Sequence, residues 1–225
     1  MNRRTLVMLL LLAVLVATPS AQVDIAPSSI QVRDFFVNSM ILDVVHRLAV
    51  KCHLVIGVSG TMRDADALPI NIEMKNGTLG EALDAVTKAD PRFEWRQSNG
   101  AILLVTRLAP LALIDVTVHS FRTHHPQSWE IPDLLQDVPE IHDWLQDHKC
   151  ALGNLRNKAD HKPKTWPRFS IHAEGLSLSS ILDQIALQSR SSEWDVIQYN
   201  AAPCEIGVDF VPRSAPNALM TIITH

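Results

Sequence analysis

Histidines and cysteines are the side chains of this sequence best suited to metal binding. The chain has ten histidines and three cysteines. The densest group is His142, His148, Cys150 and His161, with His119, His124 and His125 upstream. Zinc sites usually present ligand pairs about two to five residues apart, but His142 and His148 are six residues apart and diverge by about 240° around a helix. We expect no bound metal and no cofactor; the alternative is a metal or small-ligand carrier that uses the histidine-rich second half.

Nucleophilic chemistry has one candidate pair, Cys52 and His53. Adjacent side chains at a helix-to-strand junction diverge, whereas a catalytic base must lie within hydrogen-bond reach of its nucleophile. The sequence has no Gly-x-Ser-x-Gly elbow, phosphate-binding glycine loop or His-Glu-x-x-His motif. The paired acids fall on loops or polar faces: Glu73 with Glu81, and Asp64 with Asp66. We therefore expect no catalytic residues and no enzyme, with a hydrolase of unfamiliar site as a third alternative.

The first 21 residues have the layout of a secretory signal peptide. Arg3 and Arg4 precede an apolar run from Leu6 to Ala17, followed by small residues. This run is shorter than the roughly 20 residues that a helix needs to span a bilayer. We expect export to the periplasm or the medium, with cleavage after Ser20 or Ala21 and an uncleaved anchor as the alternative.

The mature chain is expected to be acidic and to lack a stable membrane span. Loss of Arg3 and Arg4 changes the formal net charge from −4 to −6. Lys and Arg contacts to phosphates supply most nucleic-acid affinity, so this charge argues against a nucleic-acid partner. No later apolar run approaches spanning length.

The three cysteines bear on disulfide formation in an oxidising compartment. An odd number allows at most one internal disulfide. Cys150 and Cys204 both fall in the second half and form the favoured pair. We expect Cys52 to behave as a small buried hydrophobic residue.

An internal repeat organises the chain. The stretch NGTLGEALDAVTKADPRFEW, from Asn76 to Trp95, returns in diverged form as EGLSLSSILDQIALQSRSSEW, from Glu174 to Trp194. Three dipeptides match at an offset of 99 residues: Thr78-Leu79 with Ser177-Leu178, Leu83-Asp84 with Leu182-Asp183, and Glu94-Trp95 with Glu193-Trp194. We expect two related modules, in which Trp95 and Trp194 pack against their own helices.

The first copy reads as strand, helix, strand, strand, helix and hairpin. Apolar residues of the first helix repeat at the helical period: Ile41, Val44, Val45, Leu48 and Cys52. The apolar run 53–58 predicts a strand, and Ile70, Ile72 and Met74 alternate with polar residues in the next one. Thr78 and Glu81 predict a capping box at the second helix. An Asn-Gly hairpin follows, at 99–100.

The second copy keeps the helix-and-hairpin half of this plan and diverges in its front half. Trp144, Leu145 and His148 are expected to share one buried helix face. The predicted fold class is α+β, with two small modules of helices on short mixed sheets. The expected boundaries are a signal peptide at 1–21, modules at 22–109 and 110–212 with an insertion near 150–167, and a tail at 213–225.

Residues 30–106 resemble the short domain at the N-termini of secretins and of TonB-dependent outer-membrane transducers. Three stretches carry the resemblance: ILDVVHRLAVKCHLVIGV, INIEMKNGTLGEALDAVTK and FEWRQSNGAILLV. Members of that family are periplasmic α+β modules that act by contact. In secretins the module docks on assembly partners, and in transducers it signals to an inner-membrane regulator. Nothing after Phe210 resembles a secretin channel or a receptor barrel.

The functional expectation is a non-catalytic, exported protein-interaction module of a cell-envelope secretion, transport or signalling complex. The resemblance implies a secretin, a TonB-dependent receptor or an inner-membrane regulator as partner. An unpaired edge strand can accept a strand from such a partner. The candidates are the strand with Ile70, Ile72 and Met74, and the strand 102–105. A special binding surface, if present, is expected near Trp129, Trp144, Trp166 and the insertion at 154–167.

Overall fold

The computed structural model describes residues 26–61, 69–98, 101–107, 111–153, 166–201 and 203–213. The fold is α+β, as predicted. The first half contains β1 (Gln31–Ser39), α2 (Ile41–Cys52), β2 (Ile56–Thr61), β3 (Ile70–Thr78), α3 (Leu79–Ala89), β4 (Phe93–Ser98) and β5 (Ala101–Thr106). The second half contains β6 (Thr117–His124), α4 (Ile131–Gln136), α5 (Pro139–His148), β7 (Cys150–Gly153), β8 (Ser170–Ser177), α6 (Leu178–Ser189), β9 (Ser191–Ala201) and β10 (Cys204–Pro212). Short 3₁₀ turns lie at Pro27–Ser29, Ala112–Asp115 and Ser128–Glu130.

The same order of elements occurs twice, with α4 and α5 together in the place of α2. Strands β1, β2, β3, β4 and β5 of the first module therefore correspond to β6, β7, β8, β9 and β10 of the second. Each module also has a small antiparallel ribbon, β1 with β3 and β6 with β8. The repeat in the sequence is thus a repeat of a whole α+β unit.

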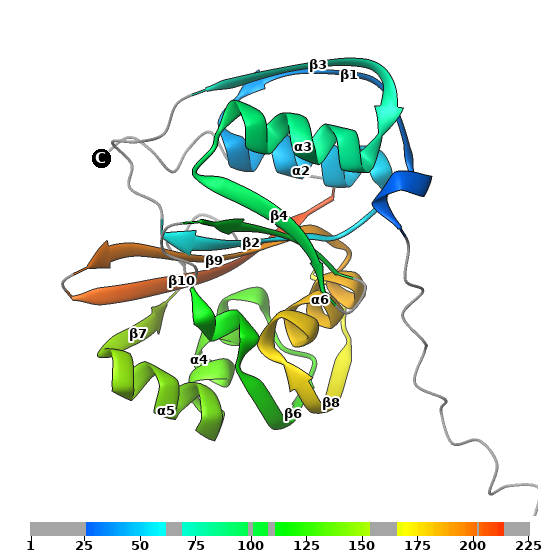
Figure 1. Cartoon of the computed structure of the whole chain (residues 1–225). Helices are drawn as coiled ribbons and strands as arrows, with labels where there is room; N and C mark the ends of the chain where they lie inside the picture. The colour runs from blue at the N-terminus through cyan, green and yellow to red at the C-terminus, as the bar shows by residue number, and fades with distance from the viewer. Residues whose placement is uncertain are drawn as a thin grey trace, which may run out of the picture.

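A single six-stranded sheet runs through both modules, in the order β4-β5-β2-β9-β10-β7. Each module supplies three neighbouring strands. The two triplets meet where β2 pairs in parallel with β9 over six residues, from Ile56 opposite Glu193 to Thr61 opposite Gln198. This joint, which we call the junction, makes the two modules one continuous sheet (Figure 1).

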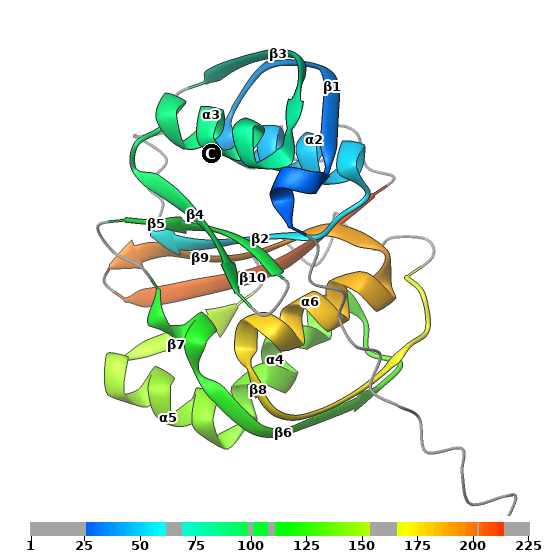
Figure 2. The same cartoon turned by 45° about the vertical axis from the view of Figure 1, so that its right-hand side comes forward.

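The helices of the two modules cover opposite faces of the sheet. In Figures 1 and 2, α2 and α3 lie above the sheet and α4, α5 and α6 lie below it. Two cores result, and β5 serves both, because Leu103 and Val105 pack with the second module whereas Ile102 and Leu104 pack with the first. Burial on both faces explains why all six residues of β5 are buried and why the strand is a continuous apolar run.

The second module is inverted relative to the first. Strand β4 is antiparallel to β5, which is parallel to β2, so β4 and β2 run in opposite directions. Strand β9 corresponds to β4 but runs parallel to β2. The second module is therefore turned over about an axis that lies in the sheet and crosses the strands, which places its helices on the other face.

Capping residues begin the two equivalent helices as the repeat predicts. The Thr78 hydroxyl accepts a hydrogen bond from the Glu81 amide at 3.2 Å, and the Glu81 carboxylate accepts one from the Thr78 amide at 2.7 Å. This is the predicted capping box. In the second module the Ser177 hydroxyl accepts a hydrogen bond from the Ser180 amide at 3.3 Å.

Three local predictions are wrong or shifted. Strand β2 occupies Ile56–Thr61 rather than 53–58, because α2 continues to Cys52 and His53 closes it in the left-handed conformation, with φ of 57°. His148 is exposed, not part of the buried face of α5. Of the predicted insertion near 150–167, the first four residues form β7, and 154–165 lie outside the described residues, as do the predicted signal peptide and 214–225.

Candidate functional site

A tryptophan–aspartate hydrogen bond occurs at the same place in each module. The indole Nε1–H of Trp95 on β4 donates to Asp84 Oδ1 on α3 at 2.7 Å. The indole Nε1–H of Trp194 on β9 donates to Asp183 Oδ1 on α6 at 2.6 Å. Both bonds span 11 residues and tie a hairpin to the preceding helix. The sequence predicted packing of both indoles on their own helices but missed the aspartates; the repeated Leu-Asp at a fixed distance from Trp was the available signal.

The two pairs differ in burial because of the junction. Trp194 is fully buried and Asp183 is 2% exposed, whereas Trp95 is half-buried and Asp84 is exposed. Strand β2 covers the second pair, with Gly57 directly opposite Trp194. A Cβ at Gly57 would overlap the indole ring. A glycine is therefore required at position 57 for the sheet to close over the tryptophan.

Asp183 is a buried carboxyl whose environment favours its neutral form. Burial raises the pKa of Asp183 to about 7, and the hydrogen bond from Trp194 opposes this shift without cancelling it. The second oxygen, Oδ2, is buried and has no hydrogen-bond partner among the described residues. A proton on this carboxyl removes the cost of an uncompensated buried charge.

Three further polar residues meet at the junction. The Nδ1 atom of His46, on α2 of the first module, lies 3.0 Å from the Ser192 hydroxyl and 3.5 Å from Glu193 Oε2, both on β9 of the second. All three residues are at most 3% exposed. The Ser192 hydroxyl also donates to the Val211 carbonyl at 3.3 Å.

Serine, histidine and glutamate are the residue types of a nucleophilic triad, but their arrangement here differs from one. In a triad the base uses one ring nitrogen toward the nucleophile and the other toward the orienting carboxylate. Here Ser192 and Glu193 approach the same nitrogen of His46. The Ser192 side chain is also fully buried and bonded to Val211. These contacts join the two modules.

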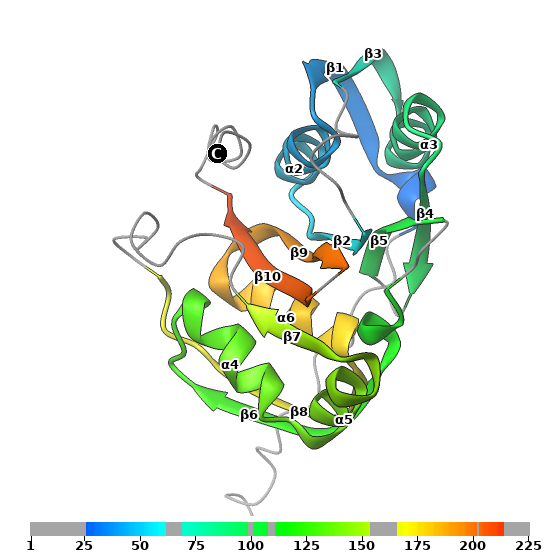
Figure 3. The ribbon, with the colours of Figure 1, turned by 90° about the vertical axis from the view of Figure 1, so that its left-hand side faces the viewer.

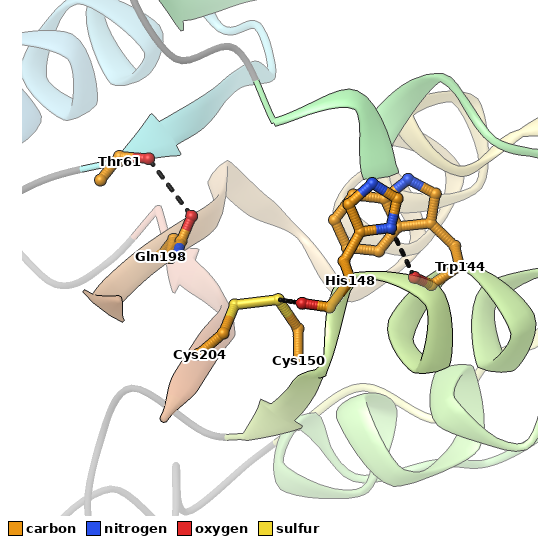
Figure 4. The surroundings of a disulfide bond; sticks show 6 residues. All are labelled: Thr61, Trp144, His148, Cys150, Gln198 and Cys204. Atoms are coloured by element: carbon orange, nitrogen blue, oxygen red, sulfur yellow. Dashed lines mark hydrogen bonds between the residues drawn. A yellow bond between two sulfur atoms is a disulfide. The ribbon is translucent and has the colours of Figure 1, made fainter. Parts of the chain in front are cut away.

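The histidines considered as metal ligands are dispersed. His148 stacks on Trp144, with ring centroids 3.9 Å apart, and its Nδ1 lies 2.7 Å from the Trp144 carbonyl (Figure 4). His142 is exposed on α5, and His124 contacts Ser170. In the part of the chain that the structure describes, no group of three His, Cys, Asp or Glu residues could hold a metal ion. His161 lies outside that part.

A disulfide joins Cys150 on β7 to Cys204 on β10, the pair favoured from the sequence (Figure 4). The two cysteines also face each other in the parallel pairing of these strands. The disulfide therefore fastens the outermost strand of the second module to its neighbour. Cys52 carries a free thiol and is half-buried rather than buried; desolvation raises the pKa of this thiol, and Lys51 opposes the shift.

The two candidate edge strands occupy different positions. Ile70 and Ile72 are buried in the first core and Met74 is half-buried, all on β3, which pairs with β1 along one side. The strand 102–105 is not an edge, because β5 lies between β4 and β2. The sequence could not reveal this, since a continuous apolar strand is compatible with several sheet orders. Among the described strands, β4 and β7 are the edges of the large sheet (Figure 3).

Two of the tryptophans considered as a separate binding surface, Trp144 and Trp166, are half-buried against the second core. Trp166 packs against Phe169 and Phe210, with ring centroids at 6.1 and 6.3 Å. It is half-buried against the second core. Trp144 is half-buried under His148.

Comparison with family models, curated proteins and solved structures finds no match to this chain. Across the described residues, none of the helices combines the length and apolar character needed to cross a bilayer.

Proposed function

We propose that this chain is a non-catalytic protein-interaction module that is exported to the periplasm and serves as an adaptor or accessory component of a cell-envelope secretion, transport or signalling complex. The observation that carries the proposal is the distribution of its chemical groups. The serine, histidine and carboxylates suited to chemistry are buried at the junction, while strand edges and an exposed aromatic side chain are available for contact.

Among the described residues of the first module, the most exposed large apolar side chain is Phe36 on the β1–β3 ribbon. Phe36 is 53% exposed, and it lies opposite Glu73 on β3. Each strand of the ribbon has nine residues. A ribbon of this length can accept a partner strand along an edge, and Phe36 adds an apolar anchor of the kind that interfaces favour. The resemblance of residues 30–106 to the secretin and TonB short domain favours a secretin, a TonB-dependent receptor or an inner-membrane regulator as partner.

The test is an affinity pull-down of the mature chain from its own envelope fraction after mild crosslinking. Wild type is compared with Phe36→Asp, and Leu187→Asp is the matched control because Leu187 is 50% exposed on α6, in the other module. We expect one envelope protein to be recovered with wild type and with the Leu187 variant, and several-fold less with the Phe36 variant. Recovery that is equal for all three baits, or of no envelope protein by folded wild type, contradicts the proposal.

A carrier function for the histidine-rich half predicts a different result. Zinc added to the purified chain would raise its melting temperature, and His142→Ala or His148→Ala would reduce the rise. We expect zinc to leave the melting temperature unchanged.

A further inference from the structure

The junction uses one edge of each module and leaves the other edge of each at an end of the molecule. It joins β2 of the first module to β9 of the second. The counterpart of β9 in the first module is β4, and the counterpart of β2 in the second is β7. These two strands are the outer strands of the sheet among the described residues. The sheet of the described residues therefore ends, on opposite sides, in strands equivalent to the two that form the junction.

The β4 end carries counterparts of two of the three residues that the junction buries near the start of β9, whereas Ser192 corresponds to Phe93. Glu94 and Trp95 match Glu193 and Trp194 in type and position. Trp95 has the same hydrogen bond to the preceding helix as Trp194. The difference is exposure, since Glu94 is exposed and Trp95 half-buried, whereas Glu193 and Trp194 are fully buried. The β4 end is thus the equivalent of a surface that, in the second module, is covered by a strand.

The β7 end carries counterparts of two residues that the first module contributes to the junction, and the counterparts of 58–61 lie outside the described residues. Helices α2 and α5 both end in a left-handed residue, His53 and Lys149, with φ of 57° and 53°. Aligned on these caps, His46 and Gly57 of the junction correspond to His142 and Gly153. His142 is exposed on α5. A Cβ at Gly153 would meet nothing within 4 Å, in contrast to the overlap with Trp194 at Gly57.

The directions of the two end strands also fit. Five strand pairings separate β4 from β7 along the sheet, and two of them are antiparallel. Two reversals cancel, so β4 and β7 run in the same direction. A second copy moved along the sheet without turning would place its β4 parallel to β7, as β9 lies parallel to β2. The two modules can be aligned on their helix caps and hairpins. In that alignment, the pairing of β7 with β10 is shifted by two residues relative to the pairing of β2 with β5. An even displacement keeps Gly153 on the face turned away from the helices of its own module, as Gly57 is in the first module.

From these correspondences we infer that a second copy of this chain docks head-to-tail, with its β4 edge on the β7 edge of the first. Trp95 of one copy lies over Gly153 of the other, and Glu94 approaches His142. The contact is heterologous, so further copies extend the sheet into an open chain or a ring. The inference concerns self-association and does not depend on an envelope partner.

The test blocks one end at a time in the purified mature chain. Gly153→Val blocks the β7 end. The added side chain meets open space in the monomer, but it occupies the space that Trp95 of a second copy would fill. Trp95→Ala removes the β4 contact; Glu94→Arg is a second β4 variant at an exposed position. Sedimentation velocity is measured for each protein up to about 1 mM, the affinity range of weak complexes. Circular dichroism and melting temperature establish that each variant is folded.

We expect the wild type to form dimers and larger species as concentration rises, and each end-blocked variant to associate at least about 10-fold more weakly. A mixture of Gly153→Val with Trp95→Ala has one intact β4 end and one intact β7 end, so it should form a dimer and nothing larger. A wild type that stays monomeric overturns the inference. So does a folded Gly153→Val variant that associates as wild type does, because a symmetric β4–β4 contact or an unrelated surface would then be responsible. Neither result bears on recovery of an envelope partner.

Discussion

Trp194 of the second module lies in register with Gly57 of the first, and the indole ring occupies the space where any other residue at position 57 would place its Cβ. This contact lets β2 pair with β9 and so joins two three-stranded sheets into one. It also buries Asp183, the hydrogen-bond partner of Trp194. The junction therefore sets both the architecture and the one strongly perturbed carboxyl described above.

Gly57→Ala should destabilise the protein, whereas Gly153→Ala should not. The new methyl group at position 57 overlaps a ring that is itself fully buried, so we expect the free energy of unfolding to fall by about 2–3 kcal/mol. At position 153 the same substitution meets open space and should change the free energy of unfolding by at most about 0.5 kcal/mol. Urea titration of both variants measures the difference. Equal effects at the two positions would show that the ring can move away.

Asp183→Asn should change the pH dependence of stability. The folded-state pKa of Asp183 is about 7, above the 3.8 of an ordinary aspartate, so the folded protein retains a proton that the unfolded chain releases. This contribution to stability is complete below about pH 4 and is lost as pH rises toward about 7. The amide cannot ionise, so the variant should gain about 1–3 kcal/mol relative to wild type between about pH 4 and about pH 8.

Urea unfolding of wild type and Asp183→Asn at about pH 4 and about pH 8 measures this effect. Asp84→Asn is the matched control, because Asp84 makes the same bond to Trp95 but is exposed. The control should leave the pH dependence as in wild type. If Asp183→Asn did the same, Asp183 would be ionised in the folded protein at neutral pH.

His46→Ala should weaken the junction, and His142→Ala should not. Removal of His46 takes away the hydrogen bond to Ser192 and the imidazole ring beside the Glu193 carboxylate; Ser192 and Glu193 are both fully buried. Loss of a buried polar partner of this kind costs about 2–4 kcal/mol. His142 occupies the equivalent position on α5 but is exposed, so its loss should cost at most about 0.5 kcal/mol. Thermal and urea unfolding of the two variants provide the comparison; similar losses would contradict this role for His46.

Replacement of Cys150 and Cys204 by serine should lower the free energy of unfolding by about 2–4 kcal/mol, because the disulfide closes a long loop in the unfolded chain. The two cysteines are 54 residues apart. Their loss should also speed amide hydrogen exchange in β7, which the disulfide fastens to β10. Cys52→Ser is the control and should cost less than about 1 kcal/mol, since Cys52 is half-buried and carries a free thiol. Unchanged exchange in β7 would mean that hydrogen bonds alone hold this strand.

Local signals in the sequence determined the elements and their repetition. Thr78 and Glu81 predict the helix start because capping needs only residues three apart, and the offset of 99 residues that relates Trp95 to Trp194 identifies two modules. What these signals lack is information on which strands become neighbours. The sequence for that reason allows the strand 102–105 as an edge, although β5 lies inside the sheet.

The tertiary structure alone decided how the two modules join. Gly57 and Trp194 are 137 residues apart, and their contact depends on the inversion of the second module and on the pairing of β2 with β9. The same type of pair, Trp with Asp, is buried in one module and half-open in the other. The sequence by itself established that the same residue types, Leu-Asp and Glu-Trp, recur at an offset of 99 residues. Only the packing of distant strands determined that one copy is covered and the other available, because burial is a property of neighbours and not of residue type.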